Sequence, residues 1–62
     1  MRFEIDFNSK GEPYFRFVAN NNKTLFHSQG YDDIRDCKHA IELTKQYAAQ
    51  AEVVDVRHKS LY

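Results

Sequence analysis

The first hydrophobic residues of the chain alternate with charged ones. Phe3, Ile5 and Phe7 occupy every second position, which is the period expected of a strand with one buried face. A similar alternation recurs over residues 13–19, after a turn-forming segment at residues 8–11. These two segments predict the first two strands of an antiparallel sheet.

A third strand is predicted over residues 23–28, after the asparagine turn at residues 20–22. Leu25 and Phe26 are adjacent within it, and adjacent residues of a strand point to opposite faces. We expect Leu25 to point toward the core.

The apolar spacing then changes to three and four residues, which is typical of an amphipathic helix. We predict a helix from residue 33 to about residue 50, with Asp33 as its N-cap and Asp36 three residues later as in a capping box. The apolar stripe of this helix consists of Ile34, Cys37, Ala40, Ile41, Thr44 and Ala48.

A short β-branched run near the end of the chain, containing Val53, Val54 and Val56, predicts a fourth strand. The element order is therefore βββαβ, an α+β domain over residues 1–57 with an antiparallel sheet and one helix packed on one face. Residues 58–62 are expected to form a frayed tail. Only two or three residues separate the last strand from the helix, so this strand must find an open sheet edge.

The small size of the chain bears on its stability. It has 62 residues and one cysteine, so an internal disulfide is excluded, while a core of this size barely offsets the entropy of folding. A bound metal or a second subunit would be the remaining ways to stabilise the fold.

The nine basic and nine acidic side chains cancel, which argues against nucleic acid or an anionic membrane as partner. Without a signal-peptide core or a spanning run, we expect a cytoplasmic protein.

The cysteine, histidine and aspartate residues are the candidate metal ligands and nucleophiles of the chain. Cys37 and His39 point about 200° apart on a helix and are poorly placed to share an ion, and His27 and His58 add no paired spacing. We therefore expect no metal and no cofactor, and we expect Cys37 to be a buried apolar residue.

An acidic group opens the predicted helix. It consists of Asp32, Asp33 and Asp36. Helix capping and the helix dipole account for these carboxylates better than a cation site does.

A series of short segments with matching spacing runs through nearly the whole chain. In order, it comprises Phe3-x-Ile5, Gly11-Glu12, Phe15-Arg16-Phe17, Ala19-Asn20-Asn21, Ser28-x-Gly30-Tyr31 and Cys37-x-x-Ala40-Ile41. This series resembles the YegP-like family of small, uncharacterised bacterial and archaeal proteins over about residues 2–56. The resemblance implies a β3-α-β unit that forms one continuous sheet with a second unit by exchanging C-terminal strands. For a chain with one such unit it implies a homodimer, and it implies no catalytic residues.

If the helix covers one face of the sheet, the other face is expected to present Tyr14, Arg16, Val18 and Phe26. Such a face can bind protein, stack single-stranded bases, or simply be solvated. We expect a non-catalytic interaction module. The alternatives left open are a single-stranded nucleic-acid-binding module on the same face and a thiol-based enzyme or switch on Cys37.

Overall fold

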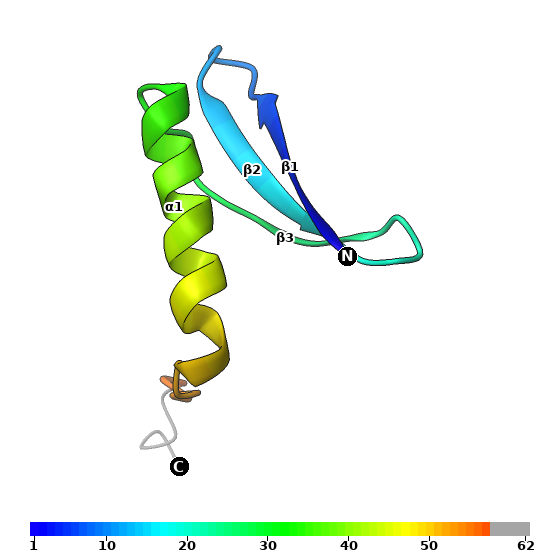
Figure 1. Cartoon of the computed structure of the whole chain (residues 1–62), viewed down its shortest axis with the longest axis vertical. Helices are drawn as coiled ribbons and strands as arrows, with labels where there is room; N and C mark the ends of the chain where they lie inside the picture. Colours follow the sequence, from blue (N-terminus) through cyan, green and yellow to red (C-terminus); the bar gives the residue numbers. More distant parts are fainter. Residues whose placement is uncertain (58–62) are drawn as a thin grey trace.

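The structure is a computed structural model that describes residues 1–57 of the chain. Three antiparallel strands form one sheet in the order β1-β2-β3, and a single α-helix followed by a short 3-10 helix lies on one side of it (Figure 1). The elements are β1 Arg2–Phe7, β2 Pro13–Val18, β3 Thr24–His27, α1 Ile34–Tyr47 and η1 Ala48–Gln50. The predicted α+β arrangement of three strands and one helix is confirmed.

Both turns of the sheet depend on residues that accept a left-handed backbone. Gly11 has a φ angle of 78° in the first turn, and Asn22 has a φ angle of 65° in the second. The Asn8 side chain closes the first turn, since its Oδ1 accepts from the backbone N–H groups of Lys10 and Glu12, both at 2.9 Å. These local bonds hold β1 and β2 as an antiparallel pair.

The register of β1 on β2 places the expected residues on one face. Phe3 lies opposite Phe17 and Ile5 lies opposite Phe15. The ring centroids of Phe3 and Phe17 are 4.8 Å apart, and those of Phe3 and Phe15 are 5.7 Å apart. We call this side, which faces α1, the inner face.

The expected orientation of β3 is wrong. Phe26 lies opposite Phe17, and their ring centroids are 5.5 Å apart. Phe26 therefore shares the inner face, and its neighbour Leu25 points away. The pairing of β2 with β3 has a β-bulge between Phe17 and Val18, and the contact between the two aromatic rings stabilises this register.

The helix begins where the sequence predicts. The Oδ1 atom of Asp33 accepts from the backbone N–H of Asp36 at 3.0 Å, so Asp33 is the N-cap. The predicted end near residue 50 is also close, since α1 ends at Tyr47 and η1 continues to Gln50.

The core lies between β2 and residues 34–41 of α1. Its buried members are Phe15, Cys37 and Ile41, and the partly buried residues packed against them are Phe3, Tyr31 and Ala40. The backbone N–H of Tyr31 donates to the carbonyl of Pro13 at 2.8 Å, which fastens the loop before α1 to the sheet.

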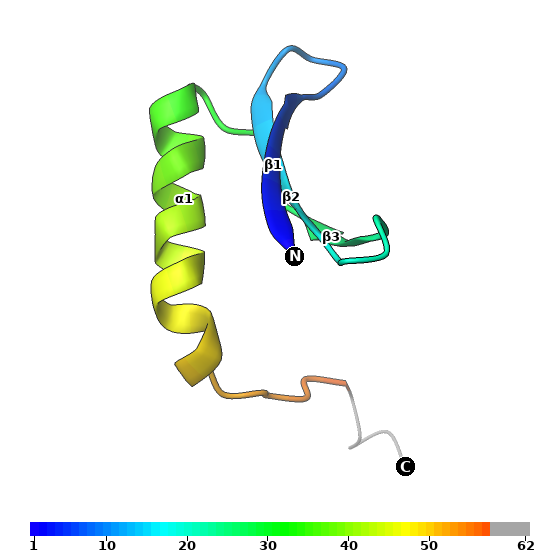
Figure 2. The ribbon, with the colours of Figure 1, turned by 45° about the vertical axis from the view of Figure 1, so that its right-hand side comes forward.

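The predicted fourth strand does not form within this chain. Residues 51–56 have no regular structure, because neither β1 nor β3 pairs with them, and they lead away from the end of α1 (Figure 2). The frayed tail expected at residues 58–62 lies outside the described residues. In the part of the chain that the structure describes, no helix is both long and apolar enough to cross a bilayer.

Candidate functional site

The outer face of the sheet carries a connected row of charged and polar side chains centred on Arg16. Its Nε donates to Oε1 of Glu4 at 2.8 Å, and its Nη1 donates to Oδ2 of Asp6 at 3.2 Å and to the hydroxyl of Tyr14 at 3.0 Å. Arg2 extends the row, since its Nε donates to the second oxygen of Glu4 at 2.6 Å. We call Arg2, Glu4, Asp6, Tyr14 and Arg16 the outer ladder.

Glu4, Asp6 and Arg16 of the outer ladder stabilise one another's charged forms. The hydrogen bond from Arg16 and then that from Arg2 lower the pKa of Glu4. The backbone N–H of Phe7 and then Arg16 lower the pKa of Asp6. Both carboxylates in turn raise the pKa of Arg16 above its ordinary value. The guanidinium of Arg16 is thus neutralised by two carboxylates of the neighbouring strand.

The four residues expected on this face are not assembled as one surface. Tyr14 and Arg16 lie together on the outer ladder. Val18 is only 3% exposed, at the β-bulge, and so is not available as an open contact. Phe26 lies on the opposite, inner face beside Phe17 and is 46% exposed. Only Tyr14 and Arg16 remain of the predicted interaction face.

One neighbour of Tyr14 was missed from the sequence. His27 of β3 lies with its ring centroid 6.1 Å from that of Tyr14, nearly perpendicular to it. Asn8, Ser28 and Gly30 join these two rings around a hollow of about 230 Å³. The Nδ1 atom of His27 lies within hydrogen-bond distance, 3.1 Å, of the carbonyl oxygen of Ser28. Nothing in the local spacing signals this meeting, which depends on strand pairing.

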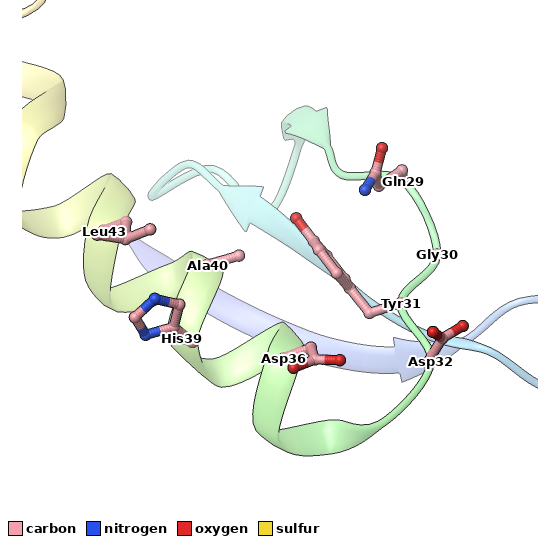
Figure 3. Close-up of a pocket in the computed structure, with 8 residues that line it drawn as sticks. All are labelled: Gln29, Gly30, Tyr31, Asp32, Asp36, His39, Ala40 and Leu43. Atoms are coloured by element: carbon pink, nitrogen blue, oxygen red, sulfur yellow. The ribbon is translucent and has the colours of Figure 1, made fainter.

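A second, larger hollow of about 530 Å³ lies between α1 and the loop that precedes it (Figure 3). Asp36, His39 and Leu43 come from the helix, whereas Tyr31 and Asp32 come from the loop. Although these include three possible ligands, no three side chains of His, Cys, Asp or Glu within residues 1–57 are placed to hold a metal ion together. We assign no ligand to this hollow.

Cys37 is buried, as expected. It is fully enclosed in the core with Phe15 and Ile41, and burial raises the pKa of its thiol. A thiol that is both enclosed and protonated is a poor nucleophile. His39 is exposed on the same helix, and His58 lies outside the described residues.

The C-terminal segment, which we define as residues 53–57, is the most exposed apolar part of the described chain. Val53, Val54 and Val56 are 98%, 63% and 80% exposed. Arg57 is paired with Asp55, with 2.6 Å between Nη2 and Oδ2. In the described part of the chain, β1 and β3 are each paired on one side only. An exposed β-branched segment and two open sheet edges therefore occur in one small molecule.

Comparisons with known proteins identify a family and several relatives. A family described as a domain of unknown function (DUF1508) matches residues 8–55. A UPF0339 protein of Agrobacterium fabrum is 44% identical over 55 residues, which cover 89% of each chain. A UPF0339 protein of Neisseria meningitidis serogroup B is 36% identical over 56 residues, covering 90% of this chain and all of that protein. These matches take in β2, β3, α1 and most of the C-terminal segment. The chain therefore belongs to the DUF1508 family, which is described as a domain of unknown function. This agrees with the YegP-like resemblance of its sequence.

Proposed function

We propose that the protein is a non-catalytic interaction module that works as a homodimer, with the C-terminal segment of each copy paired to the sheet of the other. The observation that carries this proposal is the exposure of Val53, Val54 and Val56, at 98%, 63% and 80%. A run of β-branched residues favours a strand, and a strand needs a neighbour for its backbone N–H and C=O groups. A second copy offers open edges for it.

The small core of the single chain supports the same proposal. Only Phe15, Val18, Cys37 and Ile41 are buried hydrophobic residues in the described part of the chain. Chains of this size usually need a disulfide, a metal or a partner subunit. Burying a valine side chain contributes about 1.5 to 3 kcal/mol, so reciprocal exchange of this segment would add substantially to the stability of both copies.

The outer ladder supports a protein contact over a nucleic-acid contact. To bind a phosphate, Arg16 would have to leave Glu4 and Asp6, which already satisfy its charge at 2.8 and 3.2 Å. Its approach to a base is also limited, because the same guanidinium donates to Tyr14. A face with balanced charges and one aromatic ring suits the polar rim of a protein interface. The burial of Cys37 supports the proposal of a non-catalytic role, because its thiol is enclosed in the core.

Sedimentation equilibrium together with amide hydrogen exchange tests the homodimer. We expect a mass near 15 kDa, about twice the 7.4 kDa of one chain, and slow exchange at the amides of residues 53–56, because strand pairing protects them. A monomer at micromolar concentrations with fast exchange at these amides would contradict the proposal.

Fluorescence anisotropy with a labelled single-stranded oligonucleotide at low salt tests the nucleic-acid alternative. We expect no binding by the natural protein. Salt-sensitive binding that is lost in a Tyr14→Ala, Arg16→Ala double variant would instead favour the alternative.

A further inference from the structure

The hollow beside Tyr14 and His27 has the size of a single side chain. Its volume is about 230 Å³, and its lining residues are Asn8, Tyr14, His27, Ser28 and Gly30. Sites for whole small molecules are usually larger, about 300 to 1,000 Å³. A role for this hollow rests on the interaction module proposed above, since one buried anchor side chain is the usual centre of a protein contact.

Hydrogen bonds within the chain already fix the polar walls of the hollow. The Oδ1 atom of Asn8 accepts from two backbone N–H groups of the first turn, and its Nδ2 donates to Oε1 of Glu12 at 3.0 Å. The Oγ atom of Ser28 accepts from the backbone N–H of Phe15 at 3.0 Å. Because these walls are ordered in advance, a ligand that enters the hollow loses little affinity to ordering them.

The charges around the hollow favour a neutral ligand. None of its five lining residues is an aspartate, glutamate, lysine or arginine. Arg16 lies 6.0 Å from the centroid of the Tyr14 ring, but it is already paired with Glu4 and Asp6. A charged ligand would give up hydration here without finding a free opposite charge.

The two rings of the hollow favour an aromatic ligand. The ring centroids of Tyr14 and His27 are 6.1 Å apart, and their planes are nearly perpendicular. On the inner face, Phe3 packs against two rings at once, those of Phe15 and Phe17, at 5.7 and 4.8 Å. The outer face has two rings of such a cluster, and a third ring in the hollow would lie within the usual distance of aromatic pairs.

The hydroxyl of Tyr14 favours a ring that carries an acceptor. It accepts from Nη1 of Arg16 at 3.0 Å, and a hydroxyl that accepts can also donate its own hydrogen. A bond from a charged donor strengthens that second bond through polarisation. Among aromatic side chains, tyrosine combines a neutral ring with an acceptor oxygen.

We infer that the hollow between Tyr14 and His27 is a binding site for the ring of one tyrosine side chain of a partner protein. The ring packs against both aromatic residues, and its hydroxyl oxygen accepts from Tyr14.

Nuclear magnetic resonance titrations of the natural protein test the site with three small probes. p-Cresol represents the tyrosine side chain, cyclohexanol is a ring alcohol of similar size without aromatic character, and uridine represents a nucleobase. Amide shifts are followed for the residues that line the hollow. The p-cresol titration is repeated with His27→Ala, which removes one ring, and with the matched control His39→Ala, an exposed histidine of α1 that lies outside the hollow.

We expect p-cresol to bind saturably in the millimolar range, with its largest shifts at the lining residues and little effect of cyclohexanol or uridine. His27→Ala should raise the dissociation constant about fivefold or more, and His39→Ala should leave it unchanged.

The inference would be overturned by p-cresol shifts that do not saturate or that scatter over the chain. Equal binding of cyclohexanol would also overturn it, and tighter binding of uridine would assign the hollow to a nucleobase instead. If His27→Ala fails to fold, as judged by circular dichroism, the shifts of the natural protein decide. Sedimentation tests the homodimer separately, so a dimer that binds no p-cresol would lose this site and keep its proposed assembly.

Discussion

Two parts of α1, residues 34–41 and residues 42–47, differ in how much of their apolar surface the chain itself covers. In the first part, Cys37 is fully buried and Ile41 is 9% exposed, because β2 lies against them. In the second part, Leu43 is 44% exposed and Tyr47 is 54% exposed. Figures 1 and 2 both show the second part extending past the end of the sheet, toward the C-terminal segment.

This difference separates a self-sufficient region from one that lacks a partner. Phe15, Cys37 and Ile41, from β2 and the first part of α1, bury one another. The second part of α1 and the C-terminal segment carry apolar residues that are about half or more exposed in the described chain. Exposed apolar surface of this kind in a small protein commonly marks a protein–protein contact. The comparison therefore agrees with the proposed homodimer, and four measurements test it.

The largest effect is expected in the region that lacks a partner. A Val54→Asp, Val56→Asp double variant should raise the dimer dissociation constant about 100-fold or more, because each buried valine contributes about 1.5 kcal/mol or more and 1.4 kcal/mol is a tenfold change. Sedimentation equilibrium over a range of concentrations measures it. Val53→Asp is the matched control, since Val53 alternates to the charged side of the segment and should cost much less. If the two variants raised the dissociation constant equally, Val54 and Val56 would not share a buried side that Val53 lacks.

The second measurement compares the two parts of α1 directly. Ile41→Ala should lower the free energy of unfolding by about 2 to 5 kcal/mol, because it leaves a cavity beside Phe15. Leu43→Ala, on the exposed side of the same helix, should cost less than about 1 kcal/mol. Urea unfolding at one fixed protein concentration measures both. If the two losses were equal, the second part of α1 would be as well covered as the first part.

The third measurement concerns the loop that joins the sheet to α1. A Cβ atom at Gly30 would lie 2.8 Å from Nδ2 of Asn8 and 3.0 Å from Cβ of Glu12. Gly30→Ala should therefore lower the free energy of unfolding by about 1 to 3 kcal/mol through overpacking. Gly11→Ala is the control, since a Cβ there meets nothing within 4 Å and only the φ angle of 78° opposes it; it should cost about 1 kcal/mol. A Gly30→Ala variant that is as stable as the natural protein would show that this loop shifts to accommodate the added methyl group.

The smallest effect is a dependence of stability on pH in the self-sufficient region. The backbone N–H of Asp36 is the main cause that lowers the pKa of Asp33, and the pKa values of Glu4 and Asp6 are also lowered. Because these folded-state values lie below the unfolded ones, their contribution is present at neutral pH and is lost as the pH falls through the folded pKa.

Thermal unfolding followed by circular dichroism should show this as a falling midpoint below about pH 4. Asp33→Asn keeps a capping oxygen but cannot titrate, so its midpoint should fall less steeply over the same range. A steeper fall for Asp33→Asn than for the natural protein would contradict the assignment of Asp33 as a stabilising carboxylate.

Where the sequence predicted correctly, the signal was local. The helix start follows from one aspartate accepting from a backbone N–H three residues later, and the inner face of β1 follows from a strict period of two. In β3 the local signal was insufficient, since Leu25 and Phe26 are equally apolar neighbours in a four-residue strand. Their orientation was decided by the register of β3 on β2, which places Phe26 opposite Phe17. For the same reason, the predicted interaction face was wrong at Phe26 and Val18.

The three strands, the helix with its N-cap and the burial of Cys37 can be predicted from the sequence alone, because periodicity, turns and caps act within a few residues. Long-range packing sets the orientation of Phe26 toward α1, the pairing of Arg16 with Glu4 and Asp6, and the position of His27 beside Tyr14. It also leaves the C-terminal valines without a strand partner within the described chain. Each of these outcomes depends on which strand edges meet and in what register, and that is set by contacts between residues nine or more positions apart.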